Sequence, residues 1–329
     1  MTTFVADRGD AAHRLDHAAA RHLAGPLALS RSRLQHLVAS GRVRVNGATA
    51  QRAAQRLAVG DVVQVDAPPA AERQPPSAEP LPLTILHEDA ALIVLVKPAG
   101  MVAHPSHAHR SGTLLNALLW HAARDRAGHA DPVPWQPRLV QRLDKDTSGL
   151  LVVAKSAETH AALQGERAAF VKEYLAVVWG RPRPARGTID ERLGRDPMDR
   201  RRVMVRTGGA AATTRYQLLD HSRGDARGVS LVRCELVTGR THQLRVHLAS
   251  QGWPIVGDQT YGQPPRARLP NPARDHAARV FARHALHAWR LQFRHPQSGR
   301  LLHFEAPVPA DLAELMAVTA LGRGLPEQP

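Results

Sequence analysis

The sequence predicts an α+β protein, with a small N-terminal domain followed by a larger domain built on a central, mainly antiparallel sheet. Three observations predict this class. A segment over residues 68–82 contains six prolines and divides the chain unequally. The part after it carries short apolar runs typical of strands, with helical patterns between them. The length of 329 residues accommodates one large and one small domain.

The small domain is predicted over residues 11–67. Ser30 can cap a helix whose apolar face carries Leu34, Leu37 and Val38, and Gly41 can end it. An alternating strand over residues 42–45 leads into Asn46-Gly47, a strong hairpin signal. A further strand is expected at residues 62–65. The proline-rich segment 68–82 then acts as a tether between the domains.

The large domain is predicted over residues 83–315, with a C-terminal tail at 316–329. Strands are expected at residues 84–86 and 91–96 as an antiparallel pair, then at 150–154 and 174–179. Helices are expected at 113–121, after a Ser156 cap, and from a Thr241 cap to about Gln251. The arginine-rich stretches 194–209 and 263–279 are predicted to be long loops that could follow an RNA backbone.

The charge and the cysteine content limit the class of protein. A formal net charge of +15 indicates a polyanionic partner. Arginine carries most of it and suits bidentate phosphate contacts, although biased codon usage is an open alternative for the arginine excess. The only cysteine, Cys234, lies in an alternating stretch and is expected to be a buried structural thiol. No apolar run is long enough to span a bilayer, and a cytoplasmic protein is expected.

The segment 141–149 is the strongest chemical signal. It reads Gln-Arg-Leu-Asp-Lys-Asp-Thr-Ser-Gly and places Arg142 two residues before Asp144, directly ahead of an apolar strand. Such an acid at the mouth of a strand is well placed for catalysis. In isolation, an Asx-turn acid in a loop would be the simpler interpretation of Asp144.

The segment resembles the signature H-R-L-D-x-x-T-S/T-G of the RluA family of RNA pseudouridine synthases, with Gln141 in place of the usual histidine. Three further segments are similar to motifs of this family and occur in its order. They are Lys97-Pro98-Ala99-Gly100, Lys172-Glu173-Tyr174-Leu175-Ala176 and Thr238-Gly239-Arg240-Thr241-His242-Gln243-Leu244-Arg245-Val246-His247. Val96 departs from the usual asparagine before the first of them.

The resemblance implies a role for each matching residue. Asp144 would be the catalytic residue, Tyr174 would stack on the target uracil, and Arg245 would pair with Asp144. Arg142 would occupy the space of an extruded base. The other residues expected to contact substrate or RNA are Thr147, Arg240, His242 and Gln243. Whether Asp144 attacks C1′, attacks C6 or removes a sugar proton is left open.

The small domain resembles the S4 RNA-binding module. Its helix and the following hairpin carry the arginines that would face phosphates, namely Arg31, Arg33, Arg42 and Arg44. Without that resemblance, a solvated basic helix face would be the simpler interpretation.

Together the resemblances imply an isomerase that converts uridine to pseudouridine without a cofactor, and no nucleotide-binding fingerprint is seen. The large-subunit pseudouridine synthase D group matches best, which implies a stem-loop of 23S rRNA or a pre-50S particle as substrate for a monomeric enzyme. Two alternatives remain: a non-catalytic S4-type RNA-binding or ribosome-assembly protein, and a synthase for another rRNA or tRNA site. The histidines at 104–109 fit no metal-ligand spacing, so no metal site is expected.

Overall fold

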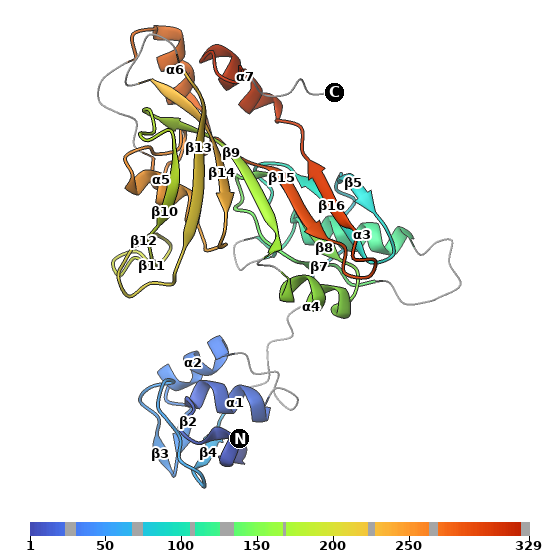
Figure 1. Ribbon diagram of the computed structural model, residues 1–329. Coiled ribbons are helices and arrows are strands. Elements are labelled where there is room, and N and C mark those ends of the chain that lie inside the picture. The colour runs from blue at the N-terminus through green and yellow to red at the C-terminus, as the bar shows by residue number, and fades with distance from the viewer. Residues whose placement is uncertain are drawn as a thin grey trace. The chain divides into compact units, whose positions relative to one another are not determined.

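A computed structural model describes residues 1–23, 31–67, 75–105, 109–125, 135–166, 169–222, 228–262 and 269–323. The chain divides into two units, Met1–Pro75 and Pro76–Pro329 (Figure 1). Ser30, one of the residues expected to cap a helix, lies outside the described residues. Among the described helices, none combines the length and apolar character needed to cross a bilayer.

The N-terminal unit packs two helices against a four-stranded sheet of order β1-β4-β2-β3. Its core includes Leu15, Leu34 and Val63. Asn46 and Gly47 both adopt positive φ, as the predicted hairpin turn requires. The bounds are β1 Thr2–Val5, a short 3-10 helix η1 Arg8–Asp10, α1 Leu15–Leu23, α2 Arg31–Ala39, β2 Val43–Val45, β3 Ala48–Thr49 and β4 Val62–Val65. Because β1 pairs with β4, the predicted domain start at residue 11 is too late.

The larger unit is built on a ten-stranded sheet of order β10-β13-β14-β9-β15-β8-β6-β5, with β16 beside β15 and β7 beside β8. Only the β15–β8 pairing of this sheet is parallel among the described residues, so the expected antiparallel character is confirmed. The strands are β5 Thr84–Glu88, β6 Leu92–Lys97, β7 Arg138–Leu139, β8 Ser148–Ala154, β9 Val171–Trp179, β10 Arg186–Asp190, β13 Thr213–His221, β14 Val229–Leu236, β15 Leu286–Arg294 and β16 Leu301–Glu305.

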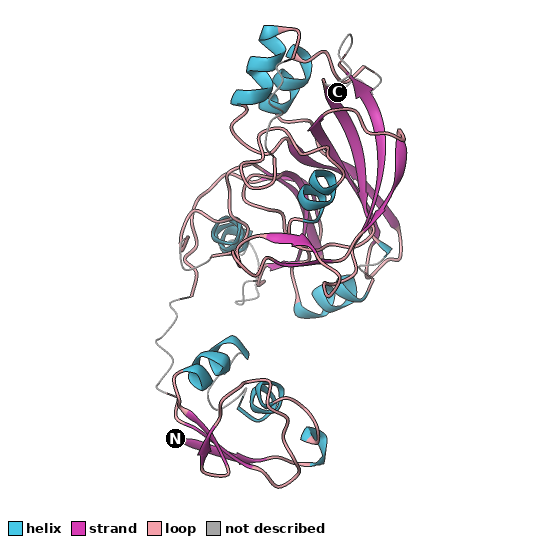
Figure 2. Cartoon of the chain, turned by 90° about the vertical axis from the view of Figure 1, so that its left-hand side faces the viewer, coloured by secondary structure: helices cyan, strands magenta, loops and turns pink. Residues whose placement is uncertain are grey.

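The described part of this unit contains five α-helices, which lie around the strands (Figure 2). Ser156 caps its helix as expected, accepting a hydrogen bond from the Thr159 amide. The helices are α3 Leu114–Asp125, α4 Ala157–Gly165, α5 Gln243–Ser250, α6 Pro272–Val280 and α7 Ala310–Val318.

The structure corrects three sequence predictions for this unit. The stretch 194–209 is not a long loop, because β11 Leu193–Arg195 and β12 Val203–Val205 pair as a hairpin. The stretch 263–279 is not a long loop in its described part, because residues 272–279 belong to helix α6. The tail predicted from residue 316 begins later, since Met316 and Leu321 pack into the main core.

Strand β8 positions the loop that carries Asp144. All seven of its residues are buried, which explains the continuous apolar run in the sequence. Gly149 adopts a φ of +116°, and a Cβ there would lie 2.1 Å from the Ala288 carbonyl oxygen. Only glycine permits β8 to approach β15 this closely.

Candidate active site

The loop before β8 presents Asp144 to solvent, and α5 presents an arginine to it. The Thr147 amide donates to the Asp144 carbonyl at 3.1 Å and closes the turn. The Asp144 side chain is 21% exposed, and Arg245 Nη1 donates to its Oδ2 at 3.0 Å. The expected ion pair is therefore present, although 101 residues separate its partners.

A second carboxylate fixes the Arg245 guanidinium. Its Nε and Nη2 donate to the two oxygens of Asp258 at 2.7 and 2.9 Å. Burial opposes the charge on Arg245, but the hydrogen bonds that it donates to Asp258 and Asp144, with the charges of both carboxylates, raise the pKa of Arg245 above its ordinary value. Burial acts to raise the pKa of Asp258, but the hydrogen bond and charge of Arg245, together with the amides of Thr260 and Tyr261, lower that pKa below its ordinary value. The two hydrogen bonds to Asp258 therefore fix the orientation of the Arg245 guanidinium, and its remaining nitrogen, Nη1, is directed to Asp144.

Asp144 and Arg245 line a cleft that is open to solvent. Tyr174 enters it from β9, where it lies between Cys234 and Ala288 of the neighbouring strands. Arg142 is an exposed cation at the same cleft. The lining residues are Arg142, Leu143, Asp144, Thr147, Tyr174, Leu236, Arg240, His242, Gln243, Leu244, Arg245 and Leu286. Apolar walls beside a charged pair suit a flat base that carries polar edges.

Buried polar groups support the Asp144 loop from behind. Lys97 Nζ donates to the carbonyls of Pro98, Met101 and Lys145 at 2.7 to 2.9 Å. Its position explains the Lys-Pro-x-Gly segment, because the ammonium ties the end of β6 to the loop that carries Asp144. Burial lowers the pKa of Lys97 to about 8.

Two further side chains hold the same loop and were not singled out from the sequence. Arg283 Nη1 donates to the Asp146 carbonyl at 3.1 Å. His284 Nε2 lies 2.7 Å from the Thr147 hydroxyl, and burial lowers the pKa of His284 to about 4. Both belong to the segment Arg283-His284-Ala285-Leu286-His287, whose density of polar residues in an apolar strand was the available signal.

The start of α5 differs from the prediction. Thr241 does not cap the helix; His242 is the N-cap residue, with a φ of +54° and no capping side-chain bond. Gln243, the first residue of the helix, instead holds the preceding turn, because its Oε1 accepts from the Thr238 hydroxyl and the Arg240 amide. The Gln243 amide nitrogen donates to Thr213 and Thr214, so its polar atoms are engaged within the protein.

The other expected RNA contacts differ in their accessibility. In the N-terminal unit, Arg42 and Arg44 are exposed and Arg33 is half-buried, whereas the side chain of Arg31 lies outside the described residues. Arg240 is exposed at the cleft, while Thr147 is buried beneath it. Exposed arginines are accessible to phosphates, whereas Thr147 forms hydrogen bonds within the Asp144 loop and to His284.

Asp258 and Tyr261 are site residues that sequence reasoning missed. Asp258 accepts from the amides of Thr260 and Tyr261 in addition to Arg245. The Tyr261 hydroxyl lies 2.8 Å from His242 Nδ1 and accepts from the Val203 amide. A Gly-Asp pair followed by one of only three tyrosines was the weak signal in the sequence.

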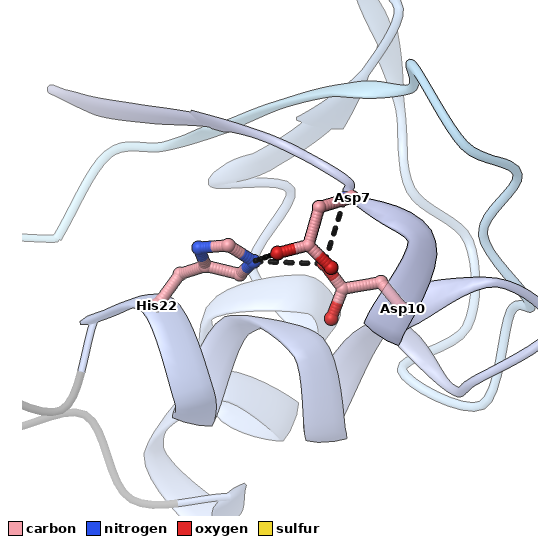
Figure 3. Close-up of side chains that lie close together, drawn as sticks. All are labelled: Asp7, Asp10 and His22. Atoms are coloured by element: carbon pink, nitrogen blue, oxygen red, sulfur yellow. Dashed lines mark hydrogen bonds and ion pairs between the residues drawn. The ribbon is translucent and has the colours of Figure 1, made fainter.

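An acidic cluster in the N-terminal unit has a structural explanation. Asp7, Asp10 and His22 converge there (Figure 3). Arg21 Nη2 already bridges the two carboxylates, at 2.5 and 2.8 Å. Asp7 and Asp10 also form a reciprocal capping box on η1. An arginine therefore supplies the positive charge that this cluster requires.

Comparison with known proteins agrees with the site geometry. The family profile described as RNA pseudouridylate synthase matches residues 91–250, and the S4 domain profile matches residues 26–63. The ribosomal large subunit pseudouridine synthase D of Nitrosomonas europaea is 41% identical over 92% of this chain and 83% of its own. An uncharacterised RNA pseudouridine synthase of Chloroflexus aurantiacus is 45% identical over 92% of this chain and 88% of its own.

A solved structure agrees. Human RNA Pseudouridylate Synthase Domain Containing 4 superposes with a TM-score of 0.58 at 26% identity, covering 73% of this chain and 94% of its own. The family profile, the relatives and the solved structure all indicate an RNA pseudouridine synthase. The motif residues of the Asp144 loop, β9 and α5 line one cleft. The chain therefore belongs to the RNA pseudouridine synthase family and carries an S4 domain at its N-terminus.

Proposed function

We propose that this enzyme isomerises uridines of large-subunit ribosomal RNA, with Asp144 as its catalytic residue. The observation that carries the proposal is the Asp144 carboxylate, partly exposed in a cleft and paired with a buried, fixed guanidinium. Relatives named ribosomal large subunit pseudouridine synthase D support the choice of RNA. Members of this family catalyse isomerisation, so the non-catalytic alternative is not favoured.

The reaction breaks the bond between N1 and C1′, turns the uracil and rejoins it to C1′ through C5. The C5 proton is lost and N1 regains a proton, so the product is an isomer and no electrons are exchanged. The target nucleotide must leave its stack to enter the cleft. Asp144 would then act on the flipped nucleoside, Tyr174 would cover the base, and Arg142 at the rim would fill the vacated space.

Gln243 and Thr147 are better explained as positioning groups than as RNA contacts, because both make internal hydrogen bonds. Direct phosphate contacts fall instead to exposed arginines such as Arg240, Arg42 and Arg44. The net charge of +15 agrees with this arrangement. Binding to RNA should therefore weaken steeply as salt increases.

We further propose that the enzyme acts as a monomer in the cytoplasm, on free 23S rRNA or on a pre-50S particle. Light scattering of the purified protein would test the monomer. Modification of naked rRNA, compared with that of isolated precursor particles, would separate the two substrates.

The decisive experiment compares Asp144→Asn with wild type on large-subunit rRNA. Pseudouridines are mapped by carbodiimide adducts and primer extension, and total tRNA is tested in parallel. Asp144→Asn should form no detectable product. Asp190→Asn, an exposed carboxylate on β10 that accepts from Thr213, is the matched control and should remain active. Product formation by Asp144→Asn at the wild-type rate would refute the role, and activity on tRNA alone would refute the substrate.

A further inference from the structure

Tyr261 is the meeting point of three parts of the larger unit. Its hydroxyl accepts from the Val203 amide at 2.8 Å, in the hairpin β11–β12. The same hydroxyl lies 2.8 Å from Nδ1 of His242 at the start of α5. Its ring lies against Arg245, with 5.1 Å between the guanidinium carbon and the ring centre. A single phenol thus touches the hairpin, the N-cap residue and the partner of Asp144.

These contacts determine the direction of the hydrogen bonds. The Val203 amide can only donate, so it occupies a lone pair of the Tyr261 oxygen. Among the contacts of the described residues, His242 Nδ1 is then the one acceptor for the hydroxyl proton. Burial lowers the pKa of His242, against an opposing effect of Asp144, so the ring carries one proton at neutral pH. With Nδ1 accepting, that proton resides on Nε2.

His242 Nε2 is the ring atom that faces the catalytic carboxylate, 3.8 Å from Asp144 Oδ2. That separation is longer than a direct hydrogen bond but short enough for electrostatic influence. In the neutral ring, a protonated Nε2 directs the positive end of its N–H dipole at the carboxylate, whereas the opposite tautomer would direct a lone pair at it. The tautomer of His242 therefore matters to Asp144.

We propose that Tyr261 is a positioning residue that sets the tautomer of His242, so that the His242 Nε2–H faces Asp144 beside the Arg245 guanidinium. The docked hairpin takes part, because the Val203 amide directs the Tyr261 hydroxyl. The inference rests on the proposed role of Asp144 and adds His242 and Tyr261 to the groups that prepare it.

Two substitutions of His242 test whether an N–H group at the position of Nε2 is what Asp144 requires. The amide nitrogen of glutamine can replace Nε2, whereas that of asparagine can replace only Nδ1. His242→Gln should therefore keep the single-turnover rate within about threefold, and His242→Asn should lower it by about tenfold or more. Equal losses in the two variants would overturn the proposal.

Tyr261→Phe removes only the hydroxyl. At saturating rRNA it should lower the single-turnover rate by about tenfold, while the RNA concentration for half-maximal rate changes less than about twofold. Tyr216→Phe is the control, because the Tyr216 hydroxyl donates to the Pro184 carbonyl at 3.3 Å, outside the residues that line the cleft. It should stay within about twofold of wild type.

A double-mutant cycle completes the test. In the His242→Gln background no tautomer remains to be set, so Tyr261→Phe should add less than about a twofold loss. Additive losses would show that the hydroxyl acts only by holding the hairpin, and would overturn the proposal. Asp144→Asn is measured alongside, and product formation by that variant at the wild-type rate would refute the proposed function. If Asp144→Asn is inactive but the losses caused by His242→Gln and Tyr261→Phe are additive, only this inference is refuted.

Discussion

Replacing Asp258 by asparagine should destabilise the larger unit strongly, although the new side chain has nearly the same shape. Asp258 accepts hydrogen bonds from Arg245 Nε and Nη2 and from the amides of Thr260 and Tyr261, at 2.7 to 3.1 Å. The side chains of Asp258 and Arg245 are only 1% and 9% exposed. The substitution leaves a buried guanidinium without its fork, which typically costs about 3 to 5 kcal/mol. Stabilities of single domains are on the order of 5 to 15 kcal/mol.

The chain contains a control with the same pairing geometry on its surface. Arg201 donates through Nε and Nη2 to the two oxygens of Asp199 at 3.0 and 3.1 Å. These side chains are 92% and 33% exposed. Asp199→Asn should therefore cause no measurable change in stability. The two variants differ in burial and not in the geometry of the bonds that are lost.

Thermal unfolding followed by circular dichroism tests the pair. Asp258→Asn should lower the Tm by on the order of 10 °C, and urea titration should give the corresponding loss of unfolding free energy. Rates of pseudouridine formation should also fall, because Arg245 loses its orientation toward Asp144. A loss of stability no larger than that of Asp199→Asn would refute the reasoning that burial sets the magnitude.

The pH dependence provides an independent check. The folded protein holds the pKa of Asp258 below its usual value, so this carboxylate contributes stability that is present above the unfolded pKa. That contribution is lost as the pH falls through the lower folded value. The difference in unfolding free energy between wild type and Asp258→Asn should be constant near neutral pH and shrink below about pH 4.

Gly149→Ala should destabilise by more than about 4 kcal/mol, because the new methyl group meets the Ala288 carbonyl at 2.1 Å. Gly252→Ala, which also has positive φ but has open space, should cost only about 1 kcal/mol by urea titration. Burial raises the pKa of Cys234 to about 12, so a thiol reagent at pH 8 should react only after unfolding, and rapid labelling of the native protein would contradict this. Burial lowers the pKa of Lys97 to about 8, so the unfolding free energy should rise from about pH 8 toward 10.5. That rise should be absent in Lys97→Met, and an unchanged slope in the variant would exclude Lys97 as its cause.

Local pattern was sufficient wherever one stretch of chain decides its own structure. The aliphatic run at residues 91–96 became the buried strand β6, and Ser156 capped α4. Asn46-Gly47 formed its turn because few other residues adopt positive φ at low cost. These elements depend on the strand, capping and turn propensities of residues that are close together in the sequence.

Prediction failed where elements were short or depended on distant partners. Strands β11 and β12 have three residues each, too few for a periodic signal, and arginines dominate the stretch between them. Strand β1 exists because it pairs with β4, whose register no local feature of residues 2–5 reveals. Thr241 does not cap α5, because the helix begins one residue later, after His242 with its positive φ, and no local pattern reveals that backbone conformation.

The sequence by itself determined the class of fold, the presence of the motifs and, through their resemblance, the identity of the Asp144 and Arg245 pair. Only the tertiary structure showed what holds that pair in place: Asp258 behind the guanidinium, His284 beneath the loop, and Tyr261 beside His242. The reason is physical. Residue types and local spacing can be read along the chain. Hydrogen-bond partners that are distant in sequence depend on how strands and helices pack, and this packing exists only in the folded protein.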